Sequence, residues 1–212
     1  MSLWLLKCLV IAAALGAWFR TQAWLARRPL PEGLHDRVHE LTAPLHRRLS
    51  EAPRAADALL VFTSALIDLA GLALLASAIF GESFGPFLGL LVLFALRQLC
   101  QGLCALPPPP GMIWRDPGVP SLLVTYGTAN DLFFSGHTAI AVYAALEMAR
   151  HFGAWGVAAG ALFVLIEAAT VLVLRAHYTL DVFAGAVTAL AVWILVQQAA
   201  PAVDGWLALL AR

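Results

Sequence analysis

Charged side chains are scarce in this sequence. Only 12% of its 212 residues are Asp, Glu, Lys or Arg and 61% are hydrophobic, whereas a soluble domain has roughly 25% charged residues. The 13 basic and 13 acidic residues balance, so the chain has no net charge that would attract nucleic acid. This composition excludes an ordinary soluble domain. It predicts an all-α protein that crosses a membrane several times, as a single domain over residues 1–212.

Cysteine is also rare. The three cysteines (Cys8, Cys100 and Cys104) lie in apolar stretches, and Cys100 and Cys104 share a helix face. Two neighbouring thiols complete neither a metal site nor a disulfide framework. We therefore interpret the cysteines as packing residues and expect no metal site.

Six apolar stretches are candidates for membrane helices, each of which needs about 20 residues. They lie at roughly 3–24, 57–80, 84–106, 135–150, 154–175 and 179–199. The first is a membrane helix rather than a signal peptide, because Lys7 makes only a thin basic region and Arg20 and Trp24 follow in place of a cleavage site. We predict six transmembrane helices.

Two polar connections separate these stretches. Within residues 25–56, leucine and valine recur at spacings of three and four, which predicts an amphipathic helix over about 30–50 that lies in the membrane interface. Residues 107–134 begin with four consecutive prolines, which predicts an extended or re-entrant loop.

Ionisable residues stand at the edges of two apolar stretches, which in a membrane protein indicates a functional site. Asp131 and His137 precede and begin the fourth stretch, and His177 and Asp181 begin the sixth. With six crossings, these positions share one membrane face. We therefore expect one site built from segments that are about forty residues apart in the sequence.

The spacing of these residues predicts phosphoryl chemistry. Asp181 follows His177 by four residues, so its carboxylate can accept a proton from one ring nitrogen and leave the other free to attack phosphorus. His137 lies in the first helical turn after Ser135, a predicted N-cap, where the helix N-terminus favours an anion. His137 would protonate the leaving oxygen as a general acid.

These segments resemble the type 2 phosphatidic acid phosphatase (PAP2) superfamily, and more specifically its sphingomyelin synthase branch. The resemblance rests on Ser135-Gly136-His137-Thr138 with Asp131 before it, and on His177-Tyr178-Thr179-Leu180-Asp181-Val182. Arg97 followed by Leu106-Pro107 and Pro110-Gly111-Met112, and the early Pro29-Leu30-Pro31-Glu32, extend it. Thr170 and Val171 stand where the phosphatases have Ser-Arg, which favours the synthase branch.

The resemblance implies a six-helix bundle that moves phosphocholine or a related headgroup between lipids, with no cofactor. His137, His177 and Asp181 would be catalytic. The residues expected to bind substrate are Asp131, Arg97, Ser135, Gly136, Tyr178 and Arg175. Arg97 has a second interpretation, because it lies at the depth of Asp68 and Glu167 and could form a buried ion pair with either.

We therefore predict a headgroup transferase that acts through a phosphohistidine. The donor would be phosphatidylcholine or phosphatidylethanolamine, and the acceptor diacylglycerol or ceramide. The alternatives are a lipid phosphatase or phospholipase C, with water as acceptor, and a lipid-binding protein without activity. The predicted location is a bacterial inner membrane or an endomembrane.

The sequence leaves two further questions open. Arginines are more numerous on the side of the site, which favours a cytoplasmic site, whereas the resemblance implies an exoplasmic one. The glycine steps Gly85-Gly89 and Gly156-Gly160 allow close helix packing either within the bundle or in a homo-oligomer.

Overall fold

The computed structural model describes residues 11–13, 15–17, 19–21, 23–24, 34–104, 106–124, 126 and 132–210. The chain divides into two compact units, Met1–His35 and Asp36–Arg212. In the first unit the described residues between 11 and 24 are helical, so the predicted span 3–24 falls only partly within the described residues.

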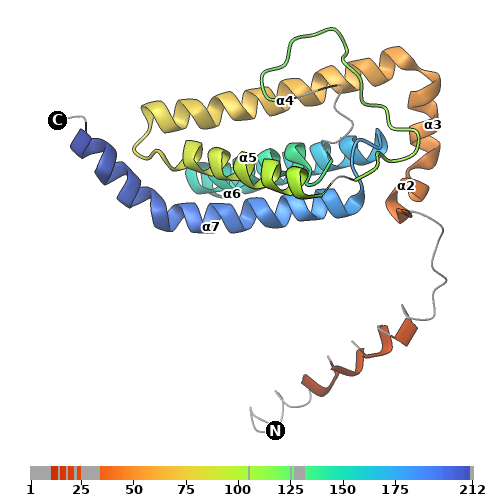
Figure 1. Cartoon of the computed structure of the whole chain (residues 1–212), viewed down its shortest axis with the longest axis horizontal. Helices are drawn as coiled ribbons and strands as arrows, with labels where there is room; N and C mark the ends of the chain where they lie inside the picture. The colour runs from red at the N-terminus through yellow and green to blue at the C-terminus, as the bar shows by residue number, and fades with distance from the viewer. Residues whose placement is uncertain are drawn as a thin grey trace. The chain divides into compact units, whose positions relative to one another are not determined.

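The second unit is built from helices (Figure 1). The described residues contain no strand, which confirms the all-α prediction. Four of the helices are long and apolar enough to cross a membrane, as expected of an integral membrane protein. In chain order the helices are α2 (Arg37–Leu41), α3 (Ala43–Glu51), α4 (Pro53–Phe80), α5 (Gly85–Leu103), α6 (Gly136–Val173) and α7 (Thr179–Leu210).

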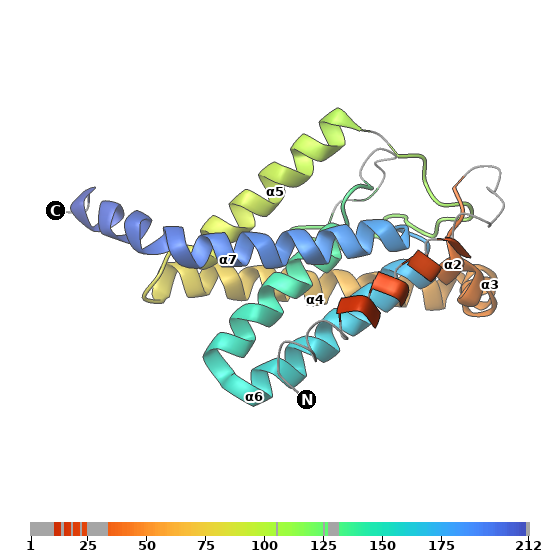
Figure 2. The ribbon, with the colours of Figure 1, turned by 90° about the horizontal axis from the view of Figure 1, so that it is seen from below.

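The structure does not show six separate spans. The predicted stretches 135–150 and 154–175 belong to one element, α6, which is interrupted at Gly153 with φ 56° and ψ −133°. This backbone conformation is open to glycine because glycine has no Cβ. Figure 2 shows the ribbon of α6 changing direction there, so that the helix has two arms, 136–152 and 154–173.

The two arms of α6 pack against each other through small residues. A Cβ added to Gly156 would lie 2.0 Å from the carbonyl oxygen of Met148, and one added to Gly160 would lie 2.7 Å from the Cβ of Ala145. Only glycine permits these approaches. The Gly156-Gly160 step therefore packs within the chain, and the fold-back returns the end of α6 toward its beginning.

The predicted interfacial segment forms two short helices, α2 and α3, which are separated at Thr42. Its leucines are largely exposed: Leu34 is 54% exposed and Leu41 is 80% exposed. The side chains that these helices bury against the bundle are instead His39 and His46. The two histidines thus attach this segment to the rest of the unit, together with Leu49, which packs against the cluster around Leu60.

Candidate active site

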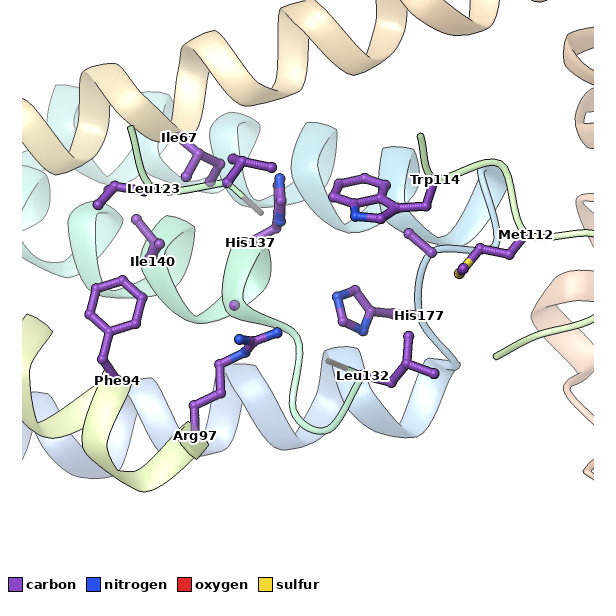
Figure 3. Close-up of a pocket in the computed structure, with 13 residues that line it drawn as sticks. Ile67, Phe94, Arg97, Met112, Trp114, Leu123, Leu132, His137, Ile140 and His177 are labelled. Carbon is purple, nitrogen blue, oxygen red and sulfur yellow. The ribbon is translucent and has the colours of Figure 1, made fainter. Parts of the chain in front are cut away.

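A cavity gathers residues from five parts of the unit: α4, α5, the connection between α5 and α6, the start of α6, and the connection between α6 and α7 (Figure 3). Its polar lining includes Arg97 from α5, His137 from the start of α6 and His177 from the connection between α6 and α7. Its free volume is about 40 Å³, space for only a few water molecules. The remaining lining side chains are mostly apolar and include Ile67, Phe94, Leu132 and Ile140.

The N-terminus of α6 is fixed by Ser135. The Ser135 hydroxyl accepts a hydrogen bond from the Thr138 amide at 3.3 Å, as an N-cap does. Its amide donates to the carbonyl oxygen of Asp181 at 3.0 Å, which ties the start of α6 to the start of α7. Ser135 is fully buried. Its described contacts are those of a structural residue that positions His137, two residues further on.

Arg97 lies against this helix terminus. Its Nε donates to the carbonyl oxygen of Phe134 at 2.9 Å, and a Cβ added to Gly136 would lie 3.2 Å from the same nitrogen. Glycine at position 136 thus lets the guanidinium approach the first turn of α6. A cation beside a helix N-terminus is a favourable place for a phosphate.

The carboxylates that could have paired with Arg97 have other contacts. Asp68 accepts hydrogen bonds at 2.8 Å from the amides of Leu122 and Leu123, in the connection that Figure 1 shows passing over α4. Glu167 accepts a hydrogen bond from the Thr63 hydroxyl. These contacts replace the ion pair that the sequence allowed, and the Arg97 guanidinium lines the cavity.

His177 and Asp181 face each other across one helical turn. The distance from His177 Nδ1 to Asp181 Oδ2 is 3.7 Å, within the range of an ion pair but longer than a hydrogen bond. Oδ2 also accepts a hydrogen bond from the Tyr178 amide at 2.9 Å. Among the described residues, Nδ1 has no hydrogen-bond partner. The buried carboxylate is therefore placed to stabilise a positive charge on the imidazole.

Side chains of the segment Asp36–Ser50 form hydrogen bonds with the connection that carries His177. The sequence did not predict this role. His39 Nε2 lies 2.9 Å from the carbonyl oxygen of His177, and His46 Nδ1 lies 2.8 Å from that of Val173. The Asp36 carboxylate accepts hydrogen bonds from the amide and hydroxyl of Thr179 at 2.6 and 2.8 Å. The one sequence feature that could have indicated this contact surface is the spacing of seven residues between His39 and His46.

The Asp36 side chain makes these contacts in its ionised form. Burial by itself would raise the pKa of this group, but the hydrogen bonds from Thr179 and the attraction to His39 outweigh it. The pKa of Asp36 therefore lies below its usual value. The same carboxylate accepts from the amides of Val38 and His39, and so caps α2.

Three of the expected substrate-binding residues do not line the cavity: Ser135, whose contacts are given above, Tyr178 and Arg175. The ring of Tyr178 lies 5.8 Å from that of His39, and burial, with the nearby charges of Asp181 and Asp36, raises its pKa. Arg175 donates from Nη1 to the carbonyl oxygen of Pro110 at 2.8 Å. The candidate Asp131 lies outside the described residues.

Arg175 also has an unusual backbone. It has φ 54° just after α6, where the amides of Arg175 and Ala176 donate to the carbonyl oxygens of Leu172 and Val171 at 3.1 and 2.8 Å. This is a Schellman motif, whose left-handed residue is usually glycine. The motif turns the chain sharply two residues before His177.

Aromatic residues form one side of the site. The ring of Trp114 lies 5.1 Å from that of His137, edge to face, and also 5.1 Å from that of Tyr126. The Tyr126 hydroxyl shares a hydrogen bond with Ser64. Within the described ranges, no three His, Cys, Asp or Glu side chains come together as metal ligands.

A family model described as AtPDCT1/2 matches residues 35–198, which is most of the chain and includes every residue of the cavity. The chain belongs to the AtPDCT1/2 family. This is a family of phosphatidylcholine:diacylglycerol cholinephosphotransferases, and membership supports a membrane phosphotransferase that acts on lipids. Comparisons with curated proteins and with solved structures gave no match.

The match corrects the assignment to the sphingomyelin synthase branch of the PAP2 superfamily, which was wrong. The matching model is that of AtPDCT1/2, not of either of those groups. The resemblance rested on short segments such as Ser135–Thr138 and His177–Val182. Short segments of this kind can recur in unrelated proteins, so they do not by themselves assign a family.

Proposed function

We propose that this AtPDCT1/2 protein transfers phosphocholine from phosphatidylcholine to diacylglycerol at the cavity between His137 and His177. The observation that carries the proposal is that these two histidines, forty residues apart in sequence, line one cavity with Arg97 while Asp181 lies behind His177. A nucleophile, its orienting carboxylate, a second proton-transfer group and a cation for the phosphate are the parts that such a reaction needs.

In the first step His177 is the nucleophile. Its Nε2 lone pair forms a bond to phosphorus, and the bond from phosphorus to the glycerol oxygen breaks. The phosphate diester bound beside His137 favours its protonated form, and this imidazolium gives its proton to the glycerol oxygen as diacylglycerol leaves. The phosphocholine-bearing imidazole keeps its proton on Nδ1 and is positively charged, which the Asp181 carboxylate at 3.7 Å stabilises.

In the second step another diacylglycerol supplies its hydroxyl. His137, now neutral, accepts the hydroxyl proton while the oxygen attacks phosphorus, and the bond to His177 Nε2 breaks. Phosphatidylcholine with a new glycerol backbone is released, and both histidines return to their starting states. Because the leaving group and the acceptor are the same kind of alcohol, one acid–base residue serves both steps.

Three features support binding of the headgroup here. Arg97 and the N-terminus of α6 provide positive potential for the phosphate diester. Trp114 and Tyr126 present aromatic faces, which attract quaternary ammonium groups. The rest of the lining is mostly apolar, which favours an alcohol acceptor over hydrolysis by water.

The test is a transfer assay with purified protein in liposomes. Phosphatidylcholine labelled in its choline is supplied with a diacylglycerol of different acyl composition, and ceramide is offered in a parallel reaction. We expect label in phosphatidylcholine that carries the new acyl chains, and a labelled His177 peptide recovered under alkaline conditions, in which phosphohistidine survives. His177→Ala should abolish both signals, whereas His35→Ala, at an exposed histidine, should retain them.

Other outcomes would reject the proposal. Label released only as water-soluble phosphocholine would make the protein a hydrolase. Label in a ceramide product would change the acceptor, and label from phosphatidylethanolamine alone would change the donor. Full transfer by His177→Ala would remove His177 from the mechanism.

A further inference from the structure

A second cavity, open on one side, lies between α4 and both arms of α6. Its volume is about 470 Å³, within the roughly 300–1,000 Å³ of small-ligand sites. Most of its lining is apolar and includes Ala70, Leu74, Ala144 and Phe163. Its polar lining is confined to Ser77, Glu147 and His151.

This cavity continues the line of the active-site cavity. Ile67 on α4 and Ile140 on α6 line the active-site cavity, and Ala70 and Ala144, three and four residues further along the same helices, line the second one. Three to four residues are one helical turn. The two cavities therefore follow each other along one seam between α4 and α6.

The distance from His137 to Glu147 along the seam is about the depth that one acyl chain reaches in a leaflet. Glu147 is ten residues after His137 on the same arm of α6, which is about 15 Å at 1.5 Å per residue. One leaflet contributes roughly half of the 30 Å hydrocarbon core, so one acyl chain reaches about this depth. At that depth Glu147 accepts hydrogen bonds from Trp193 Nε1 at 2.8 Å and Gln197 Nε2 at 3.3 Å, so a polar cluster marks the far end of the cavity.

We propose that the second cavity binds an acyl chain of the lipid whose phosphorus reacts at His177. The proposal rests on the proposed function for the position of the reacting headgroup. The headgroup would lie between His137 and His177, and one chain would run past Ile67 and Ile140 into the apolar lining as far as Glu147. The occupant is a fatty acyl chain, because the lining offers apolar contact along its length and is polar only at its end.

Such a site distinguishes lipids by the length and width of their acyl chains rather than by the hydrophobicity of those chains. The chain leaves a bilayer that is as apolar as the cavity, so its transfer gains little from the hydrophobic effect. What the cavity adds is a limit on length and width, together with a fixed position for the phosphorus relative to His177. The cavity should therefore set the chain-length preference in kcat/KM.

The experiment fills the cavity from α4 and compares two chain lengths. Ala73→Phe places a ring in the lining, and Ala76→Phe places the same ring three residues further along the same helix, at an exposed position that does not line the cavity. We expect Ala73→Phe to lower kcat/KM for dioleoyl substrates about tenfold relative to dioctanoyl substrates, the scale on which pockets discriminate chain size. Ala76→Phe should leave that ratio unchanged. If Ala73→Phe affects both chain lengths equally or neither, the proposal is overturned.

Photolabelling separates this proposal from the proposed function. Phosphatidylcholine with a diazirine at the end of one acyl chain should label the segments around Ala144–Phe152 and Phe163, and Ala73→Phe should reduce that labelling where Ala76→Phe does not. This result would hold even for a wild-type protein without transferase activity. Labelling spread over the exposed positions of α4, and equal in both variants, would mean that the chain only contacts the protein from the surrounding bilayer and would overturn the proposal. Met148→Ala, which enlarges the cavity, gives a second variant and should increase the labelling.

Discussion

His39 holds the main chain of His177, with 2.9 Å between its Nε2 and the His177 carbonyl oxygen. The two residues are 138 positions apart, and both are buried. The contact makes His39 a positioning residue for the proposed nucleophile, because it touches the backbone of His177 and not the cavity. With His46 and Asp36, it anchors the segment Asp36–Ser50 to the connection between α6 and α7.

We expect His39→Ala to lower kcat by about tenfold to a hundredfold with little change in KM. The variant leaves the buried carbonyl without its donor, and a shift of about 1 Å in a reacting group can cost on the order of a hundredfold. His39→Gln, whose amide nitrogen reaches a similar position, should recover part of the loss. Steady-state transfer kinetics would check this, and a larger loss in His39→Gln than in His39→Ala would contradict it.

Stability should depend on pH through Asp36. Its pKa is below the ordinary value of 3.8, so the unfolded chain binds the proton more tightly than the folded protein does. The stabilisation is therefore complete above about pH 5 and is lost as pH falls through the folded pKa, below 3.8. The measurement is the Tm of wild type and of Asp36→Asn in detergent across this range. Their difference should shrink on acidification, and a difference that grows toward low pH would reject this assignment.

Arg175 should show the reverse of the usual ranking of alanine and glycine. With φ 54°, a residue with a Cβ is strained, whereas glycine is not. Arg175→Ala loses the hydrogen bond to Pro110 and keeps the strain, so Arg175→Gly should be more stable than Arg175→Ala by about 1 kcal/mol. Thermal or denaturant unfolding checks the ranking. The same variants also test whether Arg175 contacts the substrate. An increase in KM of similar size in both would indicate that the arginine side chain binds substrate.

The fold-back of α6 should not tolerate a side chain at Gly156. Gly156→Ala would place its Cβ 2.0 Å from a backbone oxygen of the opposite arm, and we expect a loss of more than about 2 kcal/mol in unfolding free energy. Gly205→Ala is the matched control, because a Cβ there meets nothing within 4 Å in helix α7. That substitution should stabilise slightly, as alanine does in a helix. Equal Tm values for the two variants would argue against the close packing of the arms.

Much of the candidate site could be predicted from local sequence. Asp181 follows His177 by four residues and Ser135 precedes His137 by two, and helix geometry fixes what such neighbours can do. The helical and membrane character followed from composition, because a chain this apolar must satisfy its backbone internally. The family did not follow, since short motifs of this kind are not specific to one family.

The sequence by itself thus determined an all-α membrane protein and the local pairs from which the candidate site is built. Only the tertiary structure decided that α6 folds back at Gly153. It also decided that Arg97 lies at the cavity and does not pair with Asp68 or Glu167. Finally, it decided that His39 and His46 bind the chain around His177. The physical reason is the range of the interactions. Hydrophobicity, capping and one-turn spacing act over a few residues and can be read along the chain. Contacts across more than a hundred residues depend on how whole helices pack, and the seven-residue spacing of His39 and His46 does not by itself reveal their partners.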